Sequence, residues 1–224
     1  MQRLFIIILI SLVFKNYSVN AQAIKEAGVF AGTSYYLGEI NPNTQFYDPS
    51  PSLGIMFKYL FNSRHGLRFN CFYGQFKASD LDFHNEFQQT RKMSFSATLL
   101  DFSGIYEFNF LPYKFKDRNI VFTPFLFGGL GYDFVLKTKY RIGDHFSIPF
   151  GFGVKYMATR GLTLGLEWSY RKTFQDKIDG VSDPGTPAEN SIISNKDWYS
   201  FAGFFITFRL FDKTGNCPVY PQKQ

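Results

Sequence analysis

The stretch that decides the fold of this chain is residues 198–211, WYSFAGFFITFRLF. Read in steps of two, one face is apolar nearly throughout, and it consists of Trp198, Ser200, Ala202, Phe204, Ile206, Phe208 and Leu210. This alternation predicts a β-strand, and strands favour the aromatic and β-branched residues found here. A membrane helix would need ~20 apolar residues. We therefore expect the closing strand of a membrane β-barrel.

The first 23 residues have the organisation of a secretory signal peptide. Arg3 precedes an apolar run at 4–14, and small residues follow at Ala21 and Ala23. The alternative is a membrane helix, but the run falls short of ~20 residues and Lys15 interrupts it. We expect the signal to end near residue 23, which leaves a barrel at 24–211 and a periplasmic tail at 212–224.

The composition favours a barrel surrounded by lipid. Aromatic residues make up 20% of the chain, with 29 Phe and 14 Tyr, and membrane barrels use such residues in an apolar band with aromatic girdles. The chain has 24 basic and 18 acidic residues, so losing Arg3 and Lys15 leaves 22 against 18. Because the basic residues are spread over loops, the sequence predicts no nucleic-acid partner.

Seven further segments alternate like the closing one. We predict strands at 26–38, 53–61, 67–74, 95–108, 121–134, 146–156 and 162–171. Long connections at 41–51, 78–92, 137–144 and 175–197 alternate with short ones at 62–66, 112–119 and 158–161. Outer-membrane barrels have this pattern, with short periplasmic turns and long extracellular loops. The sequence thus predicts an all-β fold, an eight-stranded antiparallel transmembrane β-barrel.

A soluble β-sandwich or lipocalin-like barrel is the alternative fold. Such a fold points its aliphatic face inward. In the strands at 146–156 and 162–171, however, the face opposite the aromatic one is dominated by Gly, Ser, Thr, Lys, Glu and Arg. That face is too polar for a dry core, so we expect it to line a barrel lumen. By the same parity Cys71 faces lipid, and we expect no disulfide between it and Cys217 in the tail.

The predicted inward positions carry charges of both signs. They are Arg68, Glu107, Lys155, Glu167, Arg171 and Arg209. Side chains fill the space that eight strands enclose, so no passage of solutes is expected. An unpaired charge in that space would cost several kcal/mol. We therefore predict a buried ion-pair network in the lumen, in preference to a catalytic or proton-relay role.

His145 and Ser147 have the local spacing of some outer-membrane lipid hydrolases, with Glu167 as the nearest acid on the next strand. Counting from a turn near residue 160 pairs Glu167 with about Phe152, which lies five residues, or ~17 Å, from Ser147. All three side chains also point inward, whereas chemistry on lipid needs an outward face. Since a triad requires hydrogen-bond contact, we predict no enzyme. The histidines share no metal-ligand spacing, so no metal or cofactor is expected.

Several stretches together resemble the PorG-like outer-membrane proteins of Bacteroidota. They are GTSYYLGEINP at 32–42, FSIPFGFGVKY at 146–156, RKTFQDKIDGVS at 171–182, DWYSFAGFFITFRL at 197–210, and Cys217-Pro218. This family includes the barrel component of the type IX secretion system. The resemblance implies a non-enzymatic protein of the outer membrane that ties a periplasmic ring, formed by the PorK lipoprotein and PorN, to that membrane.

The resemblance implies partner contacts at the periplasmic end, in the turns at 62–66, 112–119 and 158–161 and in the tail, and the turn at 112–119 and the tail hold the candidate residues. The candidates are Tyr113, Lys114, Phe115, Lys116, Arg118, Cys217 and Pro218. Aromatic and basic residues together suit a protein interface, although they fit an interfacial aromatic belt equally well. The second hypothesis is a stand-alone surface barrel that binds lipopolysaccharide or other ligands through its long loops, where Lys137, Lys139 and Arg141 lie.

Overall fold

The structure is a computed structural model that describes residues 24–38, 41, 44–82, 94–112, 121–138, 143–159, 161–174 and 198–210. The predicted signal peptide and tail, the loop at 175–197 and most of the turn at 112–119 lie outside the described residues. Within the described part, no helix is long and apolar enough to cross a membrane.

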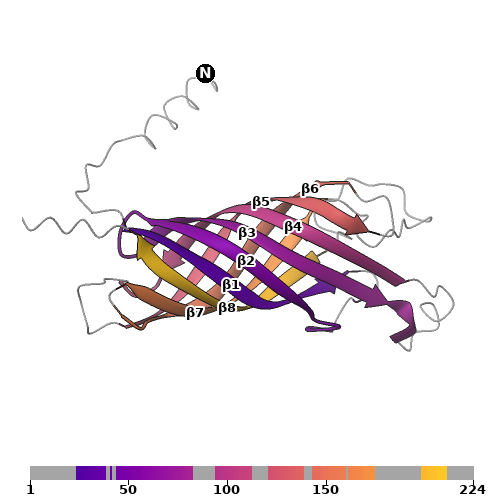
Figure 1. Cartoon of the computed structure of the whole chain (residues 1–224), viewed down its shortest axis with the longest axis horizontal. Coiled ribbons are helices and arrows are strands. Elements are labelled where there is room, and N and C mark those ends of the chain that lie inside the picture. The colour runs from indigo at the N-terminus through magenta and orange to yellow at the C-terminus, as the bar shows by residue number, and fades with distance from the viewer. Residues whose placement is uncertain are drawn as a thin grey trace, which may run out of the picture.

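The described residues form eight antiparallel strands that close into one barrel. The strands are β1 (Ile24–Leu37), β2 (Ser50–Leu60), β3 (His65–Ser79), β4 (Ser94–Asn109), β5 (Phe122–Thr138), β6 (His145–Met157), β7 (Leu162–Thr173) and β8 (Trp198–Leu210), with a 3-10 turn η1 (Asp80–Asp82) after β3. The stretch at 198–210 closes the barrel by pairing with β1 from Lys25–Leu210 to Leu37–Trp198. Figure 1 shows the strands tilted around a barrel whose long axis is horizontal. The predicted fold is confirmed.

The two ends of the barrel differ. One end carries the turns after β2 and β6, and we call it the short-turn end. The other end carries η1 and residues 44–49, and we call it the long-loop end. β3, β4 and β5 have 15, 16 and 17 residues, whereas ~9–11 suffice to cross a bilayer. The barrel wall is therefore tall enough to extend beyond the membrane.

The outer surface is apolar. Leu130, Phe204 and Phe146 are 71%, 67% and 64% exposed, and large apolar side chains on every strand are similarly exposed. Leaving a side chain of this size in water instead of burying it costs about 1.5–3 kcal/mol. Charged residues on the same strands, such as Glu107 and Lys155, are buried inside. This inverted polarity is that of a wall in contact with lipid, as the parity of the sequence predicted, and Cys71 lies half-buried on this outer face.

Two strands are longer than the sequence predicted. β3 continues to Ser79 and β5 to Thr138, so the predicted loops at 78–92 and 137–144 begin too early. Lys77 pairs with Ser96 and Lys137 with Thr98, because backbone pairing beyond the apolar band needs no apolar side chains. A register shift between Thr98 and Leu99 also breaks the regular alternation at this level.

The predicted register of the β6–β7 hairpin was wrong by one residue. Glu167 pairs with Gly153, not with Phe152. The backbone nitrogens of Ala158 and Thr159 donate to the Leu162 carbonyl at 3.0 and 3.2 Å. These bonds close the turn around residue 160, the centre used for the prediction, so the error lay in counting residues along the two strands.

Candidate functional site

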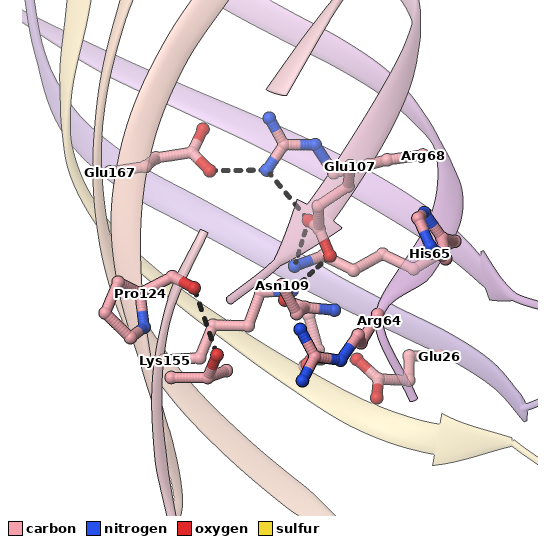
Figure 2. A network of polar contacts seen from close by, with 12 residues as sticks. Glu26, Arg64, His65, Arg68, Glu107, Asn109, Pro124, Lys155 and Glu167 are labelled. Carbon is pink, nitrogen blue, oxygen red and sulfur yellow. Dashed lines mark hydrogen bonds and ion pairs between the residues drawn. The ribbon is translucent and has the colours of Figure 1, made fainter. Parts of the chain in front are cut away.

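A cluster of charges occupies the lumen near the short-turn end. Glu107 of β4 meets Lys58 of β2 at 3.6 Å and Arg68 of β3 at 3.9 Å, and it also pairs with Lys155 of β6. Arg68 bridges onward to Glu167 of β7, with 2.5 Å between Nη1 and Oε2. Figure 2 shows Glu167, Arg68 and Glu107 following one another across the lumen. The side chains of all five residues are at most 2% exposed, so each charge depends on the others for stabilisation.

Aromatic rings cover the cations of this cluster on the side toward the barrel centre. A cation over a ring face is attracted by the ring quadrupole, and more strongly where water is excluded. The contacts are Lys58 with Phe205 at 4.0 Å, Lys155 with Phe125 at 4.4 Å and Arg68 with Phe127 at 4.5 Å from the ring centroid. The cluster thus passes directly into an aromatic layer.

Three phenylalanines extend this aromatic layer across the lumen. Phe30 stacks on Phe72 at 4.5 Å between centroids, and Phe201 meets both rings edge-on at 6.4 and 5.5 Å. All three are at most 1% exposed. The ring of Phe125 on β5 also meets that of Phe205 on β8 at 6.0 Å, so side chains from opposite sides of the barrel pack together at this level and fill the lumen.

A second polar cluster lies between the aromatic layer and the long-loop end. Asp101 of β4 accepts from Arg171 Nε at 3.0 Å, from the Tyr199 hydroxyl at 3.3 Å and from Ser103 at 2.9 Å. The carboxylate and the guanidinium thus neutralise each other in a buried site. Asp133 pairs in register with Asp101 across β4 and β5.

The structure therefore divides the predicted lumen charges. Arg68, Glu107, Lys155 and Glu167 lie in the first cluster, and Arg171 lies in the second. Arg209 is half-buried at the short-turn end, where its backbone nitrogen donates to Gly161 at 2.9 Å. Two partners escaped the prediction, Lys58 and Asp101, although the alternation of β2 and β4 already pointed both inward.

The residues of the hydrolase alternative do not meet. Glu167 binds Arg68 in the first cluster. His145 lies in the second cluster, with Nε2 at 3.3 Å from Asp133, and Ser147 pairs in register with Thr173. Among the described residues, no group of His, Cys, Asp and Glu could hold a metal ion. The candidate partner-binding residues, Tyr113, Lys114, Phe115, Lys116, Arg118, Cys217 and Pro218, lie outside the described residues.

The long-loop end carries a further cluster, on the outer face of the wall. Trp168 Nε1 donates to the Tyr35 hydroxyl at 2.7 Å and to Ser200 at 3.1 Å, and Tyr35 donates to Gln45 at 3.0 Å. Phe46 covers this group, with its ring 4.8 Å from Tyr35 and 5.4 Å from Trp168. Tyr35 is consequently fully buried on a face that otherwise contacts lipid. We call Tyr35, Gln45, Phe46, Trp168 and Ser200 the outer-rim cluster.

Tyr47, the next residue after Phe46, attaches residues 44–49 to the inner side of the barrel wall. Tyr47 packs against the buried core, and its hydroxyl donates to the Asp82 carboxylate of η1. Partial burial and this bond raise the pKa of Tyr47 to about 12. The hydroxyl is therefore a neutral donor at any physiological pH, and residues 44–49 are held on both faces of the wall.

An apolar exterior, buried charge clusters and a filled lumen define this class of protein, a transmembrane β-barrel of the outer-membrane type. The chain belongs to the family described as a domain of unknown function, DUF6089, whose model matches residues 2–220.

No curated protein matches the chain. Similar solved structures include Neisserial surface protein A, with 13% identity, 84% of this chain and 96% of that chain covered and a TM-score of 0.48. OprG from Pseudomonas aeruginosa has 15% identity, 84% and 96% coverage and a TM-score of 0.46. The N-terminal β-barrel domain of OprF from the same organism has 13% identity, 84% and 100% coverage and a TM-score of 0.45.

Proposed function

We propose that this protein is a non-enzymatic barrel of the outer membrane that anchors a periplasmic ring of a type IX secretion system. The observation that carries the proposal is the filled lumen. A barrel closed by ion pairs and stacked rings offers no path for solutes. The parts of the barrel that remain available for function are its two ends and its outer wall. A membrane anchor uses these parts, because it needs only a rigid body in the membrane and an exposed end that binds a partner.

The base of the 112–119 turn supports this role. Thr123 Oγ1 accepts from the backbone nitrogen of Leu111 at 3.1 Å and donates to its carbonyl at 3.2 Å. Phe110 donates from its backbone to Pro124 at 3.0 Å. Phe110 and Leu111 are nevertheless 45% and 41% exposed. A fixed base with exposed apolar residues at the short-turn end suits a surface that presents the basic-aromatic turn to a partner.

The test is recovery of ring proteins with the detergent-solubilised barrel. Affinity purification of the full chain should recover partners resembling PorK and PorN. Exchanging both the 112–119 turn and the 212–224 tail for Gly-Ser segments of equal length should remove them. The matched control exchanges the 62–64 turn at the same end, which should keep them. Recovery undiminished by the double exchange would overturn the proposed interface.

The second candidate function is a stand-alone surface barrel that binds ligands through its long loops. The observation in its favour is the double attachment of residues 44–49 through Phe46 outside and Tyr47 inside, since a fixed loop suits recognition. Deleting the gene separates the two functions. Loss of cargo export supports the anchor, and normal export supports the surface barrel.

A further inference from the structure

The lipid-facing wall contains a groove over β6, β7 and β8. Phe46, Phe152, Leu166, Trp168 and Ala202 line it, with Phe46 at its border toward the long-loop end. Val154 also lines it, and it touches Gly153, Glu167 and Gly203, whose strand positions face the lumen, so the groove reaches the backbone of the sheet. The cause is Ala202, a small residue that stands directly opposite Trp168 in the β7–β8 register.

The outer-rim cluster keeps this groove open. Gln45 accepts from Tyr35 at 3.0 Å and from Tyr170 at 3.3 Å, which ties the loop to β1 and β7. Phe46 has a φ of 57°, a left-handed conformation that is unfavourable for a non-glycine residue. Its packing on Trp168 offsets that cost. The side chain of Phe46 at this border of the groove is therefore fixed.

The size and lining of the groove indicate its occupant. Its volume is about 250 Å³, below the ~300–1,000 Å³ of sites for drug-sized molecules. Its lining side chains at outward positions are all apolar, and it opens toward the bilayer. A single acyl chain meets these conditions, whereas a polar headgroup does not.

Lys172 lies at the level of the wall where the headgroup of such a lipid would lie. Lys172 is four residues beyond Trp168 on β7, or ~13 Å along the strand. Its Nζ lies 5.1 Å from the ring of Trp198. Trp and Lys at the end of a lipid-facing strand mark the headgroup level of a membrane. The combination of an apolar groove and a cation at this level favours an anionic lipid.

We infer that this groove is a specific binding site for one acyl chain of lipopolysaccharide, with a lipid phosphate beside Lys172. The long loops of such barrels face outward, so the groove opens to the leaflet in which this phosphorylated, acylated lipid resides. The site lies on the wall, apart from the short-turn end. It therefore goes beyond the proposed anchor, and neither inference depends on the other.

Fluorescence quenching tests the site directly, because Trp168 lines the groove and the one other tryptophan of the sequence, Trp198, lies beside Lys172. The Trp198→Phe variant leaves Trp168 as the sole tryptophan, which is excited selectively, and keeps an aromatic ring beside Lys172. The full chain is reconstituted in vesicles of phosphatidylcholine with brominated acyl chains, which quench nearby tryptophan. Unbrominated lipopolysaccharide or phosphatidylcholine is then added, and the recovery of emission is measured.

Specific binding predicts half-recovery at a lipopolysaccharide fraction at least fivefold below that of phosphatidylcholine. Lys172→Gln should reduce this preference about fivefold, the equivalent of ~1 kcal/mol for one basic side chain at a charged membrane surface. Ala202→Leu fills the floor and should abolish the preference. Ala31→Leu, an exposed outward position on β1 that does not line the groove, is the matched control and should retain it.

Equal half-recovery for the two lipids in the parent protein would overturn the inference, and so would a preference that survives Ala202→Leu. Folding of each variant is verified by its heat-modifiable migration on gels. If Ala202→Leu does not fold, Phe46→Ala removes one of the lining side chains instead and should also lose the preference. If affinity purification recovered no periplasmic ring proteins, the lipid preference measured here would still stand. The lipid site and the anchor are therefore tested independently.

Discussion

Replacing Glu107 by Gln should destabilise the barrel more than any other single carboxylate change. Glu107 lies within 4.0 Å of Lys58, Arg68 and Lys155, and all four side chains are at most 2% exposed. Gln keeps the shape but leaves three buried cations with Glu167 and Glu26 as their remaining counter-charges. Breaking a buried pair from one side costs ~3–5 kcal/mol, because the remaining charge stays buried.

Glu26→Gln is the matched control. Glu26 is also buried, but its described hydrogen bond is to the neutral hydroxyl of Thr207 at 2.9 Å. Loss of such a bond costs ~0.5–1.5 kcal/mol, or up to ~3 when one partner is charged. The variant should therefore lose less stability than Glu107→Gln.

Urea unfolding of the barrel in vesicles, followed by tryptophan emission, measures both changes. With a slope of ~2 kcal/mol per molar urea, a loss of ~4 kcal/mol shifts the midpoint by ~2 M. Combining Glu107→Gln with Lys155→Met should recover part of the loss, because one uncompensated cation is removed. A midpoint unchanged by Glu107→Gln, or shifted no further than by Glu26→Gln, would refute the charge cluster as a unit.

Three other outcomes follow from the barrel geometry. Gly129→Ala should lower the free energy of unfolding by ~1–3 kcal/mol, because its Cβ would overlap the Gly104 carbonyl oxygen. Gly128→Ala is the control and should change it by no more than ~0.5 kcal/mol, since the nearest contact of its Cβ would be at 3.8 Å. Urea midpoints compare the two variants. The intact protein should give no stable conductance steps in planar bilayers, and ohmic steps would contradict the filled lumen. In a Cys217→Ser background, a charged maleimide should label Cys71 only after unfolding, since that thiol lies on the lipid-facing side of β3.

Much of the fold could be predicted because the membrane imposes one rule on every strand. Outward residues such as Phe204 must be apolar and inward residues such as Glu107 are free to be charged, so parity alone assigns the faces. The rule stops at the edge of the apolar band. There β3 and β5 continue through Lys77 and Lys137, and a register shift at Thr98 changes the parity.

The site was harder to predict than the fold. Parity placed Lys58 and Asp101 inside, but partners across the lumen depend on the stagger of the whole barrel, which alternation does not encode. The same stagger brings Arg171 of β7 to Asp101 of β4, 70 residues away. The sequence gives still less indication of the outer-rim cluster. Phe46 lies in a segment predicted only as a loop, and its contact with Trp168 forms only in the folded structure.

Photo-crosslinking in living cells tests the anchor most directly. A photoreactive amino acid replaces Tyr113 in the turn at the short-turn end or, as the control, Phe46 at the long-loop end. The anchor predicts an adduct between the Tyr113 position and a periplasmic ring protein, and none with that protein from the Phe46 position. Equal adducts from both positions, or none from Tyr113 while the ring proteins are present, would contradict it.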